Sequence, residues 1–106
     1  MFPVSRSRGP AGAERAAAPA PTYCFAVQAA ADPGVMSRVL ELFAKRGLVP
    51  SRWHSTVAGA AGEELHIDVQ MTALAPDLGD TIARGLRQIV HVQAVLTTVK
   101  TAGDAP

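Results

Sequence analysis

The chain has 106 residues, 48% of them hydrophobic, and a formal net charge of +1 at pH 7, so it is long enough for one small domain. The near-neutral charge argues against a general nucleic-acid or membrane-surface binder, and no apolar run approaches the ~18 residues of a membrane span. The single cysteine, Cys24, excludes an internal disulfide and a cysteine-based metal motif, which favours a cytoplasmic location.

The N-terminal segment, residues 1–21, is rich in proline, glycine and alanine and shows no apolar periodicity. Such a segment cannot bury enough apolar surface to offset the entropy cost of ordering it. We therefore expect a disordered N-terminal tail. Arg6, Arg8 and Arg15 face only one acidic residue, Glu14, which leaves an organellar targeting peptide as the alternative.

A strand, a tight turn and an amphipathic helix follow directly after the tail. Alternating apolar residues predict a strand over residues 22–30. We expect Asp32 to cap the helix, because its carboxylate can accept from free N–H groups of the first turn, and Pro33 to open it. Gly47 is placed to end the helix in the left-handed conformation. Apolar residues at three- and four-residue spacing predict one broad apolar face: Val35, Met36, Val39, Leu40 and Phe43.

Two strands joined by a short turn come next. Residues 48–57 predict the first strand, and its Pro50 favours a sheet edge, because proline cannot donate to a ladder. The turn over residues 58–62 consists of small residues and has hairpin length. Residues 65–72 alternate between apolar and polar side chains, which predicts a strand with one buried and one solvated face.

A second helix and a last strand complete the domain. Residues 75–89 predict the helix. Its apolar stripe consists of Leu78, Ile82, Leu86 and Ile89. Gly79 and Gly85 each cost about 1 kcal/mol relative to alanine inside a helix, unless close packing on the sheet requires them. Residues 90–100 predict a strand, and residues 101–106 a polar C-terminal tail.

The elements of residues 22–100 therefore follow in the order β-α-β-β-α-β. Right-handed crossovers then place two helices on one face of a four-stranded antiparallel sheet, the ferredoxin-like arrangement of the α+β class. We expect the strand order fourth, first, third, second, which puts the proline-containing strand at an edge. Because a domain of this size leaves apolar surface exposed, we also expect a homodimer formed through a sheet edge or the helices.

Polar residues on the central hairpin raise the question of a metal site. A turn centred on Ala60 places His54 opposite His66. It also places Arg52 opposite Asp68 on the same solvated face. Two histidines and a carboxylate are ligands that a divalent metal can use. Exposed histidines on a polar face are far more often simply solvated, so we expect no metal site.

Residues 31–47 read Ala-Asp-Pro-Gly-Val-Met-Ser-Arg-Val-Leu-Glu-Leu-Phe-Ala-Lys-Arg-Gly and resemble the first turn and helix of an ACT domain. The closest likeness is to the small regulatory subunit of acetolactate synthase, the first enzyme of branched-chain amino-acid biosynthesis. In that family a Pro-Gly-(apolar)-Leu-Ser-Arg-Val segment leads to an Arg-Gly exit, which residues 33–39 and 46–47 match. Residues 85–95 are similar to its Gln-Leu-x-Lys-Leu-(Val/Ile)-Asp-Val-x-x-Val segment. The resemblance covers residues 22–100 and implies an ACT-like domain there.

The resemblance implies an effector site for a small amino acid at the first turn. N–H groups at the start of a helix suit a ligand carboxylate, and a glycine there lets the ligand approach closely. The expected effector-binding residues are Asp32, Pro33, Gly34 and Val35. The family's two ligand-holding asparagines correspond to Ala31 and Val49 here, so the side-chain amides that orient a ligand are absent.

The resemblance also implies a function without catalysis. The short, single-domain small subunit docks on a thiamine-diphosphate-dependent catalytic subunit and activates it. The residues expected at the partner or dimer contact are Arg38, Glu41, Lys45 and Trp53. Because no nucleophile stands with a histidine at matching spacing, we expect neither catalytic residues nor a bound cofactor. The alternative is a free-standing ACT-like sensor that binds a small molecule, such as an amino acid, and regulates another enzyme.

Overall fold

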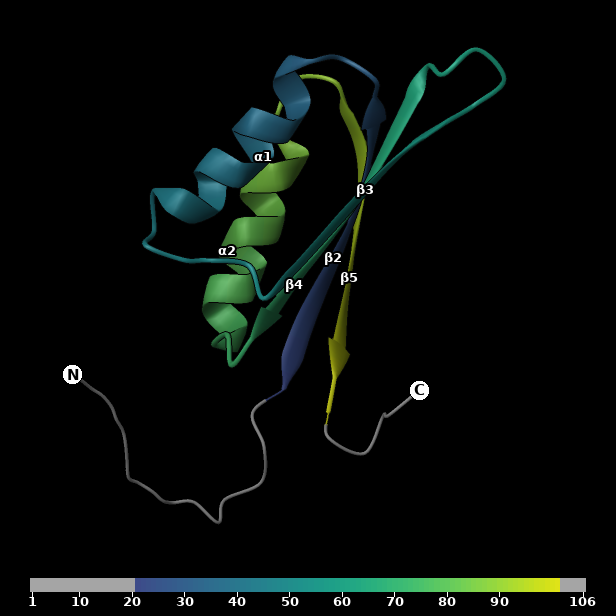
Figure 1. Cartoon of the computed structure of the whole chain (residues 1–106). Coiled ribbons are helices and arrows are strands. Elements are labelled where there is room, and N and C mark those ends of the chain that lie inside the picture. The colour runs from purple at the N-terminus through teal and green to yellow at the C-terminus, as the bar shows by residue number, and fades with distance from the viewer. Residues whose placement is uncertain (1–20, 102–106) are drawn as a thin grey trace, which may run out of the picture.

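The computed structural model describes residues 21–101, in which four strands and two helices follow in the predicted order (Figure 1). Labelled as in Figure 1, the elements are β2 (Thr22–Ala30), α1 (Gly34–Ala44), β3 (Arg52–Ala58), β4 (Glu64–Thr72), α2 (Pro76–Arg87) and β5 (Val92–Lys100). Nearly all of the two predicted tails lies outside the described residues. Neither helix of the described part is long and apolar enough to cross a membrane.

The four strands form one antiparallel sheet in the order β3-β4-β2-β5. Read from the other edge, this is the predicted order of fourth, first, third and second strand. Both helices cover the same face of the sheet (Figure 1). The strand that follows Pro50, β3, lies at an edge as predicted. These observations confirm the ferredoxin-like βαββαβ fold.

Two strands begin later than predicted. The first of them, β3, begins at Arg52 rather than at residue 48, because the chain must first pass from the end of α1 to the sheet edge. The other, β5, begins at Val92 rather than at residue 90. Here the chain turns at His91, whose φ of +77° is not that of a strand.

The ends of α1 largely follow the prediction. The helix begins at Gly34, one residue later than expected, although Pro33 already has helical angles (φ −56°, ψ −26°). Asp32 Oδ1 accepts a hydrogen bond from the Gly34 N–H at 2.8 Å, which is the predicted capping contact. Beyond the other end, Gly47 has a φ of +70° and donates its N–H to the Ala44 carbonyl at 2.9 Å.

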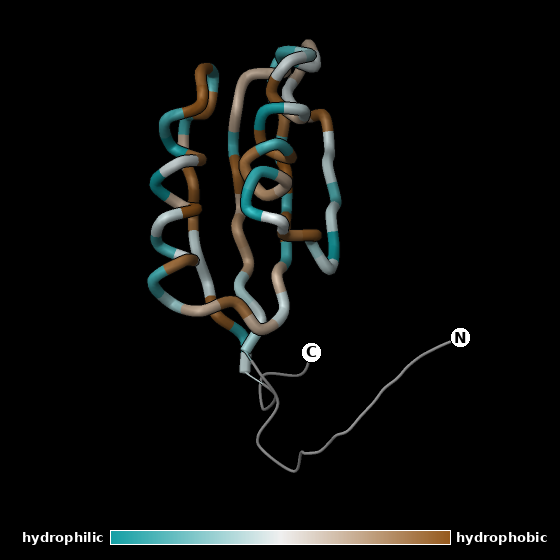
Figure 2. Tube along the Cα trace, turned by 90° about the vertical axis from the view of Figure 1, so that its left-hand side faces the viewer, coloured by the Kyte–Doolittle hydropathy of each residue, from teal (hydrophilic) through white to brown (hydrophobic). Residues whose placement is uncertain are grey.

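The hydrophobic core lies between the helices and the sheet. Its largest fully buried side chains are Phe25, Phe43, Ile67, Ile82, Leu86, Val35, Val39 and Val69. The rings of Phe25 and Phe43 pack edge to face with centroids 5.9 Å apart and so join β2 to α1. Figure 2 shows hydrophobic and hydrophilic segments alternating along both helices, as expected where one side of each helix faces the core.

The apolar stripe of α1 is wider than the face that the core buries. Val35, Val39 and Phe43 are fully buried, whereas Met36 is 41% exposed and Leu40 is 47% exposed. Successive residues of a helix lie about 100° apart around its axis, so the row of Met36 and Leu40 turns away from the row that meets the sheet. The broad apolar face is therefore buried along only one of its rows, and Met36 and Leu40 form a second row that is exposed.

Close packing explains both glycines of α2. A Cβ added at Gly79 would overlap the ring of Tyr23 on β2. A Cβ added at Gly85 would come within 2.8 Å of the Leu42 side chain on α1. Gly79 therefore lets one turn of α2 lie close to the sheet, and Gly85 lets another turn of α2 lie close to α1.

The register of the β3–β4 hairpin differs from the prediction by two residues. His54 lies opposite Asp68 rather than His66. Arg52 lies opposite Gln70 rather than Asp68. The two histidines are therefore not cross-strand neighbours, although a shift of two residues leaves every side chain on its predicted face. In the part of the chain that the structure describes, no group of three or more His, Cys, Asp or Glu residues is arranged to hold a metal ion.

The register prediction was wrong because the loop lies one residue further along the chain than the assumed turn. It spans residues 59–63 and is centred on Ala61. Gly59 and Gly62 have φ values of +93° and +71°, and the Gly62 N–H donates to the Gly59 carbonyl at 3.1 Å. The Ala61 N–H donates to Glu63 Oε1 at 2.9 Å. A charged side chain thus completes a loop that the small-residue pattern alone places one residue too early.

The contact of Gly79 with Tyr23 yields a test of the fold. We expect Gly79→Ala to lower the free energy of unfolding by about 1–2 kcal/mol, because overpacking against the ring outweighs the ~1 kcal/mol of helix propensity that alanine adds. In a Tyr23→Leu background the same change should raise the free energy of unfolding, because the ring is gone. Urea unfolding of all four proteins of this double-mutant cycle measures both values. An equal effect in the two backgrounds would contradict the packing explanation.

Candidate functional site

The segment between β2 and α1, where the effector site is predicted, lies where three loops meet. The Ala31 N–H donates to the Glu63 carbonyl in the β3–β4 loop at 2.9 Å. The Ala30 N–H donates to the His91 carbonyl in the α2–β5 loop at 2.9 Å. Backbone hydrogen bonds therefore tie the predicted site to both neighbouring loops at one end of the sheet.

The Asp32 carboxylate occupies the N-terminus of α1. Its Oδ1 accepts from the Gly34 N–H, and its Oδ2 lies 3.4 Å from His91 Nε2. Val35 donates its N–H to the Asp32 carbonyl at 3.0 Å and has a fully buried side chain. A ligand carboxylate would have to displace Asp32 from Gly34 and approach its negative charge. The turn therefore favours a cationic group over an anion when Asp32 is ionised.

Gly34 leaves space that this carboxylate uses. A Cβ added at Gly34 would lie 3.3 Å from Asp32 Oδ1, a tight contact, and would overlap the end of the Arg38 side chain. Arginine is flexible and can move aside, so the more rigid constraint is the one that Asp32 imposes. The close approach that the sequence suggests for a ligand is thus made by a side chain of the protein itself.

An apolar hollow of about 130 Å³ opens beside the carboxylate. Its lining residues are Ala31, Asp32, Pro33, Met36, Val57 and Leu65. Every one of these side chains except Asp32 is apolar. The hollow can therefore take a small apolar group whose neighbouring cation reaches Asp32.

The two positions at which the family carries asparagine lie apart. Ala31 lines the hollow, so its methyl group stands where the family has an amide. Val49 is 84% exposed in the connection between α1 and β3 and does not line the hollow. Within one chain, therefore, only alanine in place of asparagine at position 31 removes an amide from the hollow.

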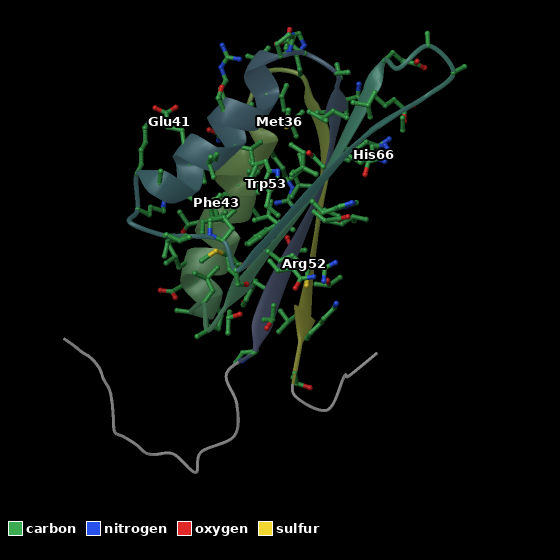
Figure 3. The ribbon with its side chains drawn as sticks, in the orientation of Figure 1. Met36, Glu41, Phe43, Arg52, Trp53 and His66 are labelled. Carbon is green, nitrogen blue, oxygen red and sulfur yellow. The ribbon has the colours of Figure 1, made fainter. Side chains whose placement is uncertain are left out.

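Three of the four predicted contact residues lie together on the outer side of α1. Glu41 Oε2 is 4.0 Å from Lys45 Nζ, and both side chains are well exposed. With Arg38 they line a groove of about 350 Å³ between α1 and α2. Trp53 lies elsewhere, on β3, where it is half-buried and packs against the core (Figure 3). The predicted contact residues therefore belong to two separate surfaces.

His91 is a site residue that the sequence analysis missed. It lies in the α2–β5 loop with a φ of +77°, a left-handed conformation that few residues other than glycine adopt. This conformation brings its ring to the Asp32 carboxylate, where a protonated imidazole would form an ion pair. The sequence pattern places His91 at the start of the predicted last strand, residues 90–100, and gives no sign of the backbone conformation that directs its ring.

A second hollow, of about 480 Å³, lies on the open face of the sheet and was also missed. Small residues of β2, Cys24 and Ala26, form its floor. Basic side chains from the two edge strands, Arg52, His54 and Lys100, stand around it and are exposed. Small residues alternating along a central strand are the sequence signal that could have indicated this hollow.

Comparison with solved structures gives the same fold in proteins of low sequence identity. The chain is similar to the ACT domain of GTP pyrophosphokinase from Chlorobium tepidum (TM-score 0.61, 12% identity, 73% of this chain and 96% of that chain covered). It is also similar to the C-terminal domain of the MgtC protein from Mycobacterium tuberculosis (TM-score 0.62, 13% identity, 82% and 95% covered). The chain is similar, too, to the regulatory subunit of aspartate kinase from Thermus flavus (TM-score 0.55, 12% identity, 78% of this chain and 52% of that chain covered).

Sequence comparison identifies the family more directly. A search of curated proteins gave no match. A sequence model of ACT-like domains, however, matches residues 17–103, which include every helix and strand of the structure. The chain therefore belongs to the family of ACT-like domains.

Proposed function

We propose that this ACT-like domain is the non-catalytic regulatory subunit of acetolactate synthase and that it activates the thiamine-diphosphate-dependent catalytic subunit by docking on it. Family membership indicates a regulatory role in small-molecule binding. The observation that carries the finer proposal is the sequence of residues 33–39 and 46–47, which matches the small-subunit pattern and flanks or lies in α1. The regulatory unit is proposed to be a homodimer in the cytoplasm.

The outer side of α1 is the proposed docking surface. Arg38, Glu41 and Lys45 are exposed there and border the groove between the helices. Opposite charges side by side favour a specific orientation of the partner over general affinity for an acidic or a basic surface. Gly85 on the floor of the groove lets the helices approach closely, so that a partner would meet two helices packed into one surface.

The proposed effector is a small branched-chain amino acid bound at the apolar hollow. Its aliphatic side chain would fill the space between Met36 and Val57, and its ammonium group would pair with the Asp32 carboxylate. This orientation differs from the one that a helix N-terminus alone suggests, because the Gly34 N–H is already bonded. The ligand carboxylate then needs a donor outside this turn. When protonated, the His91 ring, whose Nε2 lies 3.4 Å from Asp32 Oδ2, would supply that donor.

A free-standing ACT-like sensor that regulates another enzyme is the second candidate. The separation of the two surfaces favours it, because the hollow is complete within one chain and does not include the proposed docking residues. A ligand-binding domain that lacks the acetolactate synthase partner would keep the hollow and would have no need of the charged groove.

Co-expression with the acetolactate synthase catalytic subunit of the same organism tests the first candidate. We expect the two chains to co-elute in size-exclusion chromatography and the activity of the catalytic subunit to rise. The triple variant Arg38→Ala, Glu41→Ala, Lys45→Ala should lose co-elution, because it removes the charges of the docking surface. A matched control, Asp80→Ala with Arg84→Ala, removes exposed charges from α2 and should co-elute normally. Neither co-elution nor activation with the wild-type chain would disprove this partner.

Calorimetric titration with valine tests the effector site. We expect Asp32→Asn to weaken binding by about tenfold or more, because it removes a charge-assisted hydrogen bond worth about 1.5–3 kcal/mol. Asparagine still caps a helix well, so the fold should survive the change. The control Asp68→Asn lies on the open face of the sheet and should bind valine like the wild type. Equal affinity in Asp32→Asn and wild type would contradict a role of Asp32 in holding the ammonium group.

A further inference from the structure

The open face of the sheet, which neither helix covers, carries the second hollow, and the proposed function leaves this hollow unused (Figure 1). Its volume of about 480 Å³ lies within the range of ~300–1,000 Å³ that is usual for small-molecule sites. The second hollow shares no lining residue with the apolar hollow beside Asp32. It is therefore a separate place at which a ligand could bind.

The strand register arranges the side chains of this face in rows that cross all four strands. From β3 to β5, the row that we call the Cys24 row consists of Arg52, Gln70, Cys24 and Thr98. The adjacent row, the Ala26 row, consists of His54, Asp68, Ala26 and Leu96. Because alternate residues of a strand share a face, the two rows lie about 7 Å apart. Figure 3 shows Arg52 on the side of the sheet away from the helices.

Small side chains on β2 make the middle of both rows low. Cys24, which is half-buried, and Ala26 lie there, whereas longer side chains flank them on both sides. On β5, Leu96 is 69% exposed and gives the Ala26 row an apolar wall. A smaller hollow of about 200 Å³ shares Ala26 and Leu96 with the second hollow and extends it along β2. The Ala26 row therefore offers a floor and a wall to a flat apolar group.

Two permanent cations stand at the other end of the hollow, one from each edge strand. Arg52 belongs to the Cys24 row, and Lys100 lies two residues beyond Thr98 of that row on β5. Both side chains are exposed. Within residues 21–101, which the structure describes, neither side chain donates a hydrogen bond or forms an ion pair. Unpaired cations around a concave surface attract an anion, because the low-dielectric walls focus their field.

The acidic groups of this face do not cancel these cations. Asp68 is the one carboxylate among the described residues that line the hollow, and it lies in the Ala26 row. Glu64, farther along β4, already contacts His66, with Oε1 3.2 Å from Nε2. The lining thus carries two permanent positive charges against one negative charge, and the positive charges lie toward the Cys24 row. An anionic group is therefore favoured at that row.

We propose that the second hollow binds a small organic anion, a flat apolar ring that carries one phosphate or carboxylate group. The anionic group lies over Cys24 between Arg52 and Lys100. The ring lies on Ala26 against Leu96. Burial of the exposed leucine surface and the charge of the two cations both stabilise the complex. The site goes beyond the proposed function, because it adds a second ligand to a domain whose effector is assigned to the apolar hollow.

Charge and composition favour this occupant over a nucleic acid or a second copy. Single-stranded RNA is bound largely by stacking of its bases on aromatic residues, and none of the described residues that line the second hollow is aromatic. A second copy stacked face to face would bring another net positive hollow against the first. A small anion instead neutralises the excess positive charge.

Cys24 provides a specific reporter of binding, because it is the single cysteine of the chain and lies on the floor of the hollow. The measurement is the rate at which iodoacetamide, an uncharged reagent, alkylates Cys24 in the full chain as phenyl phosphate is added at constant ionic strength. We expect the rate to fall several-fold to a plateau, with a midpoint that gives the dissociation constant. The same titration with benzoate identifies whether the site prefers phosphate or carboxylate. An unchanged rate with both ring anions would overturn the proposal.

Two related compounds separate the contributions of the charge and the ring. Benzyl alcohol has the ring without the charge, and inorganic phosphate has the charge without the ring. We expect each to need a concentration at least about tenfold higher than the better ring anion for the same protection of Cys24. Equal protection by benzyl alcohol would contradict the role of the cations. Equal protection by inorganic phosphate would contradict the role of the apolar wall.

Charge variants test the two cations directly. We expect Arg52→Gln combined with Lys100→Gln to raise the midpoint for the better ring anion about tenfold, since each exposed ion pair contributes a few-fold to affinity. Asp68→Asn should lower the midpoint about two- to threefold, because it removes the opposing charge. The matched control, Lys45→Gln with Arg84→Gln, removes exposed cations from the helices and should leave the midpoint unchanged. Midpoints rather than basal rates are compared, because cations beside a thiol also change its reactivity.

The remaining outcomes separate this site from the proposed function. An unchanged midpoint in the Arg52→Gln, Lys100→Gln variant would overturn the site. Valine is assigned to the apolar hollow, so it should leave the alkylation rate unchanged and should bind this variant as it binds the wild type. Protection by a ring anion without valine binding would leave the site standing and remove the proposed effector, and valine binding without protection would have the opposite meaning. An alkylation rate that falls as the protein concentration rises, without ligand, would assign the open face to a second copy and overturn the small anion.

Discussion

The pairing of β2 with a strand on each side is the constraint on which the rest of the domain depends. Every second residue of β2 must then face the helices, and Tyr23, Phe25, Val27 and Ala29 are all buried there. The same alternation in β4 supplies the other half of the inner face of the sheet. The helices can cover only this side, which leaves the opposite face with small and polar side chains and with the exposed Leu96. The position of both hollows follows from this division.

Much of the fold could be predicted from the sequence because it depends on periodicity and on special residues. The alternation of β4, the stop at Gly47 and the edge position of the strand after Pro50 all follow from local chemistry. The register of the hairpin could not be predicted, since it depends on Glu63 folding back onto Ala61. The exposure of Met36 could not be predicted either, since a helix sequence does not say how much of its apolar arc a sheet will cover.

The candidate site was predictable in place but not in chemistry. The sequence located the turn between β2 and α1, and family resemblance assigned it to a ligand. What the sequence does not contain is the meeting of three loops that brings His91 to Asp32. Because of this contact, the turn is not a free anion site. The Asp32 carboxylate already occupies it and has partners in the Gly34 N–H and the His91 ring. The same residue thus caps a helix, contacts a distant loop and borders the apolar hollow, so a substitution of Asp32 affects local structure and binding together.

The placement of Trp53 has a spectroscopic consequence. It is the single tryptophan of the chain, and it lies half-buried on β3 rather than deep in the core. Indole emission is sensitive to how much water surrounds the ring, so the intrinsic fluorescence of this protein reports on one edge of one sheet. Any chain or ligand that covers this edge shifts the emission without a label, whereas events at the groove between the helices leave it almost unchanged. The molecule thus carries a natural optical probe that distinguishes its two candidate surfaces.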